Sequence, residues 1–258
     1  MIKNKNNYII IYGYHPIKEA ILSNNKNIKI LIIIIDKNKI NKYNFLINII
    51  KKKKISLKYT NKKYIEKIIY NNKNKKKKNY QGLISYILYK KYILKNFIIN
   101  NKKKLIILIL YNITDTKNIG SIIRSSVCFN IDLIIIQNNY WIFNPDIIKI
   151  SSGSIFKIPI CRVNNYENTI NYLKNNKIKI LSITEKSKKS CINYFNNLKE
   201  KVSIALILGN EEKGISKNII KISNDIIKIP IEKKILSLNV SVACGIILYE
   251  IYKYKLNY

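Results

Sequence analysis

"ILSLNVSVACGIILYE", residues 235–250, is an apolar, helix-forming stretch that is interrupted early by Ser237, Asn239 and Ser241. An apolar helix buries readily without such groups, so the pattern predicts a special role for the start of this helix. Ser237 or Asn239 can serve as the N-cap, because a side-chain oxygen there accepts a hydrogen bond from a free N–H of the first turn. The alternative is a polar site, and two segments upstream bear on that choice.

Two other polar segments follow apolar strands in the same part of the chain. They are NITDTKNIGSIIRSS at 112–126 and ILGNEEKGIS at 207–216. Around them, Ile- and Leu-rich runs alternate with helical stretches, which is typical of a parallel sheet covered on both faces. The expected strands are 105–111, 131–136, 158–163, 178–183, 203–208 and 225–229. Because ligands bind beyond the carboxyl ends of parallel strands, the three polar segments together predict one binding site.

The segment 112–126 contains a single glycine, Gly120, and therefore lacks the G-x-G turn of a Rossmann-type nucleotide or methyltransferase site. Asn118 and Arg124 are six positions apart, which places them about 120° apart around a helix. They can still converge if Asn118 lies at the helix start and the long arginine side chain reaches along the helix. A surface ion pair is the alternative for Arg124. However, lysine replaces arginine at almost every other basic position, which indicates a use for the planar guanidinium.

The segment 207–216 places Gly209 and Gly214 on either side of three charged residues, directly after an apolar strand. Glycine permits a tight turn and a close approach of backbone to a ligand. An ordinary strand-to-helix turn has a similar composition, so this segment alone does not identify a site.

Composition limits the classes of function. The chain has 48 basic and 14 acidic residues, a formal net charge of +34. This charge is typical of RNA binding, but Lys, Asn, Ile and Tyr are all frequent, as translation of an AT-rich genome would give. No apolar run reaches the roughly 18 residues of a membrane span. The four cysteines form no CxxC pair and His15 is the only histidine, so we expect no metal site, no disulfides and a reducing, cytoplasmic environment.

The charge is unevenly distributed along the chain. Residues 1–104 hold 27 lysines and three acidic residues, whereas 105–258 hold 21 basic and 11 acidic residues. We therefore expect a small N-terminal α/β domain over 1–88, a linker over 89–104 and a second domain over 105–258. In the first domain, helices are expected near 15–24, 40–51 and 61–70, and strands near 28–35, 55–59 and 82–88. The lysine-rich run at 71–79 is either a solvated loop or a contact to RNA phosphates.

The three polar segments, taken together, resemble a known family. NITDTKNIGSIIRSS, LILGNEEKGIS and IPIEKKILSLNVSVACGIILYE are similar to the three motifs of the SpoU/TrmH RNA ribose 2′-O-methyltransferases of the SPOUT superfamily. SSGSIFKIPICRV at 151–163 resembles the intermediate segment of that family. IYGYHPIKEAI at 11–21 and QGLIS at 81–85 look like the bacterial two-domain members that methylate a guanosine of large-subunit (23S) ribosomal RNA. Tyr80 and Glu212 depart from the family pattern, which often has histidine and a small residue there.

The resemblance implies a trefoil-knotted C-terminal methyltransferase domain with a parallel sheet, preceded by a small α/β RNA-binding domain. S-adenosylmethionine would lie bent in the knot, held largely by backbone. The residues implied at the cofactor are Leu208, Gly209, Asn210, Ile229, Leu238 and Asn239. The residues implied in catalysis are Asn118, Arg124, Glu211, Ser237 and Asn239. Arg124 would activate the ribose hydroxyl, Asn118 and Ser237 would orient Arg124 and the RNA, Glu211 would fix its loop, and Asn239 would secure the third motif.

The resemblance also implies partners. We expect a homodimer that acts on large-subunit ribosomal RNA, with no metal and no membrane partner. Because the family-like region begins by about Tyr8, no transit peptide is expected. The alternatives are a transfer-RNA 2′-O-methyltransferase and a noncatalytic RNA-binding protein of ribosome assembly that retains the fold.

Overall fold

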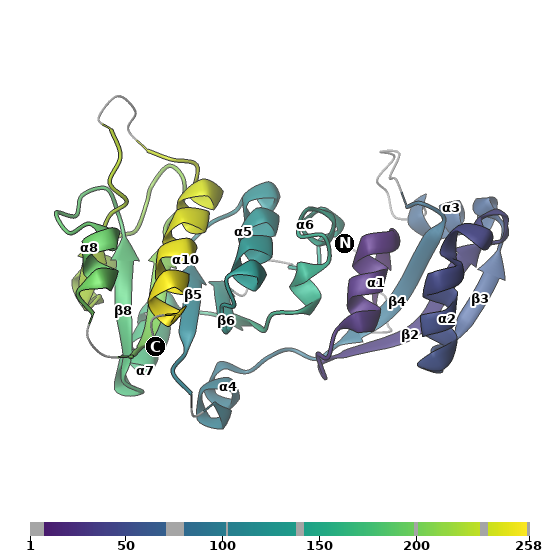
Figure 1. Ribbon diagram of the computed structural model, residues 1–258, viewed down its shortest axis with the longest axis horizontal. Coiled ribbons are helices and arrows are strands. Elements are labelled where there is room, and N and C mark those ends of the chain that lie inside the picture. The colour runs from purple at the N-terminus through teal and green to yellow at the C-terminus, as the bar shows by residue number, and fades with distance from the viewer. Residues whose placement is uncertain are drawn as a thin grey trace. The chain divides into compact units, whose positions relative to one another are not determined.

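The computed structural model describes residues 8–70, 80–101, 103–137, 142–198, 201–232 and 237–256 (Figure 1). The lysine-rich run at 71–79 lies outside the described residues. The chain forms two compact units. Unit 1 comprises Met1–Lys90 together with Phe143–Lys157, and unit 2 comprises Lys91–Ile142 together with Ile158–Tyr258. No helix in the described part of the chain is both long and apolar enough to cross a bilayer.

Unit 1 is built on a mixed four-stranded sheet in the order β1-β4-β2-β3. Strands β2 and β3 are parallel, and β4 runs antiparallel to β1 and β2. The edge strand β1 was not predicted from the sequence. The elements up to residue 89 are β1 (Tyr8–Tyr12), α1 (Tyr14–Leu22), β2 (Ile28–Asp36), η1 (Lys37–Lys39), η2 (Asn41–Tyr43), α2 (Asn44–Lys52), β3 (Leu57–Thr60), α3 (Lys62–Tyr70) and β4 (Leu83–Tyr89).

The two N-terminal segments singled out in the sequence meet at the start of α1. Gly13 precedes the helix with a φ of +91°, and its N–H donates to the carbonyl of Leu83 at 3.0 Å. The N–H of Tyr14 donates to Oε1 of Gln81 at 2.8 Å. A positive φ favours glycine, which explains why Gly13 occurs in a chain with only seven glycines.

Residues 143–157 belong to unit 1, although the sequence-based division assigned them to the C-terminal domain. This segment contains α6 (Pro145–Ile150) and η3 (Ser154–Phe156). Lys157 forms an ion pair with Glu19 at 2.5 Å, and Ser23 Oγ donates to the carbonyl of Phe156 at 2.7 Å. A Cβ on Gly153 would lie 2.8 Å from the Glu19 side chain, so only glycine permits this close contact with α1.

Unit 2 contains a six-stranded sheet in the order β10-β8-β9-β5-β6-β7, in which every neighbouring pair is parallel. This confirms the expected parallel sheet, while the trefoil knot stays a prediction. All five residues of the central strand β5 are buried. The elements are α4 (Leu94–Asn100), β5 (Ile106–Leu110), α5 (Thr116–Cys128), β6 (Leu133–Gln137), β7 (Ile160–Val163), α7 (Tyr166–Asn175), β8 (Ile178–Ile183), α8 (Cys191–Asn196), β9 (Ser203–Leu208), α9 (Lys217–Ile222), β10 (Asp225–Ile227) and α10 (Val240–Leu256).

The segment expected as a linker is partly helical. Helix α4 lies within it, and Ile98 on that helix is buried in the core of unit 2. Leu94 and Phe97 pack against the same core. Burial of these apolar side chains stabilises the helix, whereas an extended linker would leave them in water. The lysine and asparagine residues around them in the sequence suggest a linker.

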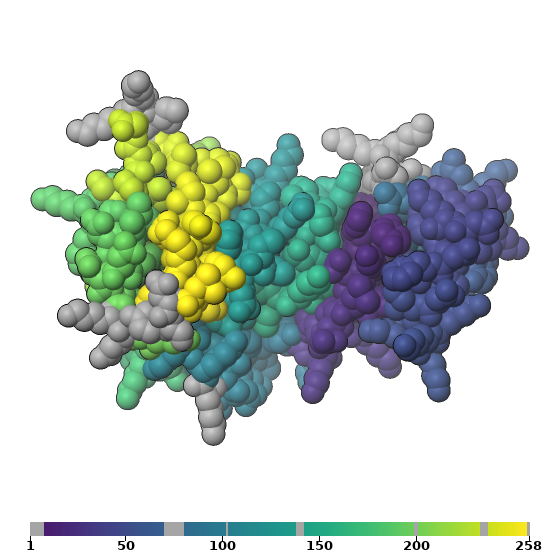
Figure 2. Space-filling model, in the orientation of Figure 1, coloured from purple at the N-terminus to yellow at the C-terminus, as the bar shows by residue number. Residues whose placement is uncertain are grey.

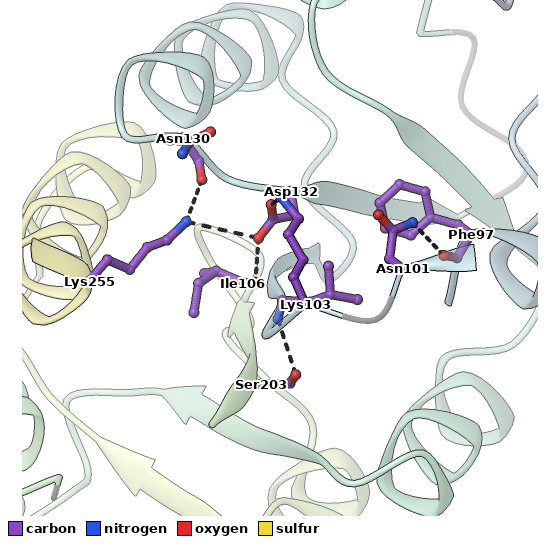
Figure 3. Close-up of polar contacts among 9 residues, drawn as sticks. Phe97, Asn101, Lys103, Ile106, Asn130, Asp132, Ser203 and Lys255 are labelled. Carbon is purple, nitrogen blue, oxygen red and sulfur yellow. Dashed lines mark hydrogen bonds and ion pairs between the residues drawn. The ribbon is translucent and has the colours of Figure 1, made fainter. Parts of the chain in front are cut away.

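A buried carboxylate ties the end of α10 to the start of the sheet (Figure 3). Asp132 accepts hydrogen bonds from the backbone N–H of Ile106 at 2.8 Å and from Lys103 Nζ at 2.5 Å. Lys255 Nζ lies 3.9 Å from the same carboxylate and donates to the carbonyl of Asn130 at 2.8 Å. Burial lowers the pKa of Lys255, and Asp132 opposes that effect. The C-terminal end of α10 is therefore fixed relative to β5.

Candidate functional site

A pocket lies beyond the carboxyl ends of β8, β9 and β10, beside the start of α10. From β5 the chain continues to β6 on one side of the sheet, and from β9 it continues to β10 on the other side. Open parallel sheets bind ligands at such switch points, beyond the carboxyl ends of the strands. Apolar side chains and polar groups share the wall in similar proportion. The lining residues are Ile183, Thr184, Glu185, Leu208, Gly209, Asn210, Glu211, Gly214, Ile215, Ile229, Ile231, Ser237, Leu238, Val240 and Ala243.

A chain of hydrogen bonds connects the three polar segments next to this pocket. Asn118 Nδ2 donates to Glu211 Oε1 at 2.9 Å, and Asn239 Nδ2 donates to Asn118 Oδ1 at 3.2 Å. Asn118 is only 8% exposed, and both the nitrogen and the oxygen of its side-chain amide have a hydrogen-bond partner, as buried polar groups require. Residues that are 93 and 121 positions away in the sequence thus meet at one buried amide.

Asn239 has both of the roles that the sequence left open. Its Oδ1 accepts from the backbone N–H of Ser241 at 2.9 Å, which makes it the N-cap of α10. Its Nδ2 simultaneously binds Asn118. The capping hydrogen bond fixes the orientation of the Asn239 amide. In that orientation the amide holds the start of α10 against α5.

The turn after β9 is built around glycines and the side chain of Asn210. A Cβ on Gly209 would lie 2.5 Å from the carbonyl carbon of Gly214, closer than real Cβ contacts. Asn210 Oδ1 accepts from the N–H groups of Glu212 and Lys213, both at 3.0 Å. Asn210 Nδ2 donates to the carbonyl of Asn112 at 3.0 Å. Asn210 therefore shapes the turn, and any contribution to a cofactor comes through its backbone or its neighbours.

The predicted residues fall into three groups. Seven line the pocket: Leu208, Gly209, Asn210, Glu211, Ile229, Ser237 and Leu238. Asn118 and Asn239 adjoin it through the hydrogen-bond chain. Arg124 is exposed and makes no hydrogen bond or ion pair with any residue that the structure describes. Asn118 lies on the buried face of α5 and Arg124 on its exposed face, as the rotation between the two positions predicts, and no hydrogen bond joins them among the described residues.

Sequence reasoning missed the contribution of the segment after β8. Ile183, Thr184 and Glu185 line the pocket, as does Ile231 after β10. The segment has no glycine and no motif, and only its place after a strand next to β9 signals a role. That signal requires the strand order, which the sequence did not provide.

Comparison with known proteins identifies the family. Residues 105–249 match the SpoU rRNA Methylase family. The chain belongs to that family. The expected family is thus confirmed, and with it the class of enzyme, an RNA methyltransferase. The matched span includes β5, the whole pocket and most of α10.

Relatives and solved structures extend the match to unit 1. A Staphylococcus aureus protein named for the TrmH family of tRNA/rRNA methyltransferases is 30% identical over 255 residues, 95% of either chain. An uncharacterized tRNA/rRNA methyltransferase of Borreliella burgdorferi is 42% identical over 157 residues, 60% of this chain and 67% of the relative. The SpoU methyltransferase AviRb of Streptomyces viridochromogenes, solved with AdoMet, is 18% identical with a TM-score of 0.77, covering 100% of this chain and 96% of that one. AviRb therefore shares the fold.

Proposed function

We propose that the protein transfers the methyl group of S-adenosylmethionine to a ribose 2′-hydroxyl of RNA, at a guanosine of large-subunit (23S) ribosomal RNA. The observation that carries this proposal is the pocket beyond β8, β9 and β10, joined to α5 by the Asn239–Asn118–Glu211 hydrogen bonds. A SpoU methyltransferase of the same fold has been solved with this cofactor. The fold and the pocket thus agree with the family chemistry.

The pocket fits the chemical groups of S-adenosylmethionine. Leu208, Ile229 and Leu238 offer apolar surface for an adenine ring. The backbone of the Gly209 turn lines the pocket and offers hydrogen-bond donors and acceptors to the polar groups of the cofactor. The cofactor supplies an electrophilic methyl group, so this chain needs only to hold a hydroxyl oxygen in line with it at about 3–3.5 Å.

Arg124 is proposed to stabilise the developing alkoxide electrostatically, because a guanidinium with a pKa above about 12 is a poor base. Its side chain is exposed and has no partner among the residues that the structure describes, which supports contact with RNA. Asn118 holds Glu211 and Asn239 together through its side-chain amide. Its role in orienting Arg124 and the RNA stays part of the proposal. Ser237 is exposed at the pocket and is proposed to orient the RNA.

The sequence of unit 1 is our reason for proposing ribosomal RNA and not transfer RNA as the substrate. Its segments 11–21 and 81–85 resemble those of two-domain enzymes that act on ribosomal RNA. The hydrogen bond from Tyr14 to Gln81 joins these two segments in the structure. We propose that this lysine-rich unit binds the RNA substrate. A cytoplasmic location is proposed as well, since all four cysteines are free thiols.

The substrate is tested by mapping 2′-O-methylation. We expect one ribose methylation in large-subunit ribosomal RNA to disappear when the gene is deleted and to return when it is restored. Purified protein with S-adenosylmethionine should add the same mark to unmodified ribosomal RNA. A mark lost from transfer RNA alone would establish the transfer-RNA alternative. If calorimetry detected no cofactor binding and no mark changed, the noncatalytic assembly role would be correct.

A homodimer is proposed through the face of α10 that the chain leaves exposed. Figure 2 shows α10 (yellow) at the surface of unit 2, and the helix packs beside α5. Val242 and Tyr249 are each 51% exposed and Ile246 is 37% exposed, at positions that share one helix face. Arg124 does not line the pocket of its own chain, so pairing in this region offers a way to bring Arg124 of one subunit to the pocket of its partner.

Disruption of this face should abolish the dimer. Val242→Glu together with Tyr249→Glu is expected to give a monomer by light scattering, because paired carboxylates cannot be buried between two copies. Ile99→Glu is the matched control, since Ile99 is 60% exposed on α4 and is not part of the face. An active wild-type monomer at assay concentrations would contradict the dimer.

A further inference from the structure

The charges around the pocket differ from those of the chain as a whole. The protein has 48 basic and 14 acidic residues. Yet among the residues that the structure describes, the only charged side chains lining the pocket are Glu185 and Glu211, and both are acidic. Lysine-rich drift would produce the opposite sign. Among the described residues, the charge of the pocket wall is therefore negative, which composition does not explain.

The two carboxylates are not equivalent. Glu211 accepts from Asn118 at 2.9 Å and from Asn210 at 3.4 Å, so it is engaged in holding the site together. Glu185 makes no hydrogen bond or ion pair within the part of the chain that is described. The nearby Lys189 is already paired with Asp225 at 2.5 Å. Glu185 is thus a carboxylate at the pocket that forms no ion pair with any lysine in the described part of the chain.

Backbone and side-chain contacts hold the segment that carries Glu185. The N–H of Thr184 donates to the carbonyl of Ile227 at 2.9 Å. Ser187 is 3% exposed, and its Oγ donates to the carbonyl of Ile226 at 2.7 Å. Both contacts are to β10, one on either side of Glu185. The backbone that carries Glu185 is therefore held to the sheet on both sides of this residue.

We propose that Glu185 makes the pocket prefer the cationic cofactor S-adenosylmethionine over its neutral thioether product, S-adenosylhomocysteine. This inference rests on the proposed function. In the transfer, the hydroxyl oxygen bonds to the methyl carbon while the carbon–sulfur bond breaks and its electron pair stays on sulfur. The hydroxyl proton leaves to solvent. The cofactor thereby loses its sulfonium charge, and the attraction to Glu185 is lost with it, which promotes release of the product.

Calorimetry with both ligands tests the proposal. Glu185→Gln is expected to weaken S-adenosylmethionine by about two- to fivefold, the range for a solvent-screened charge pair, and to leave S-adenosylhomocysteine nearly unchanged. The wild-type preference for S-adenosylmethionine should shrink as salt is raised, and that salt dependence should flatten in the variant. Glu185→Asp keeps the charge and should keep most of the preference.

Glu212→Gln is the matched control, because it removes the same charge from an exposed residue that does not line the pocket. It should alter neither affinity. If Glu185→Gln weakened both ligands equally, Glu185 would bind a group that they share, and the proposal would be overturned. An unchanged ratio in a variant with normal thermal unfolding would overturn it as well. Wild-type protein that binds neither ligand would instead refute the proposed function.

Discussion

Replacement of Arg124 by lysine is expected to lower turnover by about 10²-fold or more, the loss seen when one preorganised oxyanion donor is removed. An ammonium group keeps the positive charge but loses the planar fork of donors. That fork can hold a ribose oxygen and a neighbouring phosphate together, whereas lysine offers a single point of charge. Cofactor affinity should barely change, because Arg124 does not line the pocket.

The structure strengthens this expectation in one respect. Arg124 is exposed on α5 and has no partner among the described residues, so no interaction within the described chain explains the arginine. Single-turnover methylation with saturating cofactor would measure the chemical step, and calorimetry would measure cofactor affinity. Arg162→Lys, the same change at the only other arginine, is the control. Near-normal turnover in Arg124→Lys would mean that charge alone suffices, and loss of cofactor binding would make the role structural.

The sheet was predictable from sequence because its strands are rich in isoleucine and leucine, and the central strand β5 is wholly apolar. Every expected strand of unit 2 has a counterpart, from β5 (Ile106–Leu110) to β10 (Asp225–Ile227). Continuous burial on both faces leaves no alternation, so such runs identify buried parallel strands directly. The polar segments after β5 and β9 and before α10 were found for the same reason, since they interrupt otherwise apolar sequence.

Features that depend on distant contacts were not predictable. Gly153 is required by Glu19, which lies 134 positions away in the sequence, and nothing local in SSGS indicates a contact with α1. Glu185 follows a strand without any motif, and its place at the pocket depends on β8 lying next to β9. For Arg124 and Asn118, helix geometry predicts a separation of about 120°, which agrees with one being exposed and the other buried. The hydrogen bond from Asn118 to Glu211 joins residues 93 positions apart and was not predictable from the helix alone.

Gly209→Ala is expected to destabilise the protein by about 1–3 kcal/mol, the usual cost of forcing extra volume into a packed site. The added Cβ would lie 2.5 Å from the Gly214 carbonyl carbon and 2.8 Å from the Ile215 nitrogen. Both are backbone atoms, so the turn itself must move. The same turn carries Glu211, and its displacement would pull on Asn118 and Asn239. Cofactor affinity should therefore fall by at least about tenfold, since 1.4 kcal/mol of lost preorganisation has that effect.

Thermal unfolding and calorimetry measure the two effects, and α10 supplies the control. Within one chain a Cβ at Gly245 meets nothing within 4 Å, so for the monomer Gly245→Ala should be neutral or add up to about 1 kcal/mol of stability, as alanine does in a helix. Normal cofactor affinity in Gly209→Ala would show that the turn accommodates a methyl group.

The Gly209→Ala variant also tests the proposed dimer. Mixed with Arg124→Ala at a cofactor concentration too low to fill the Gly209→Ala pocket, it should recover about a quarter of wild-type turnover if Arg124 serves the partner's pocket, because half of the dimers would each contain one complete site. No recovery in dimers shown to exchange subunits would place Arg124 at the pocket of its own chain.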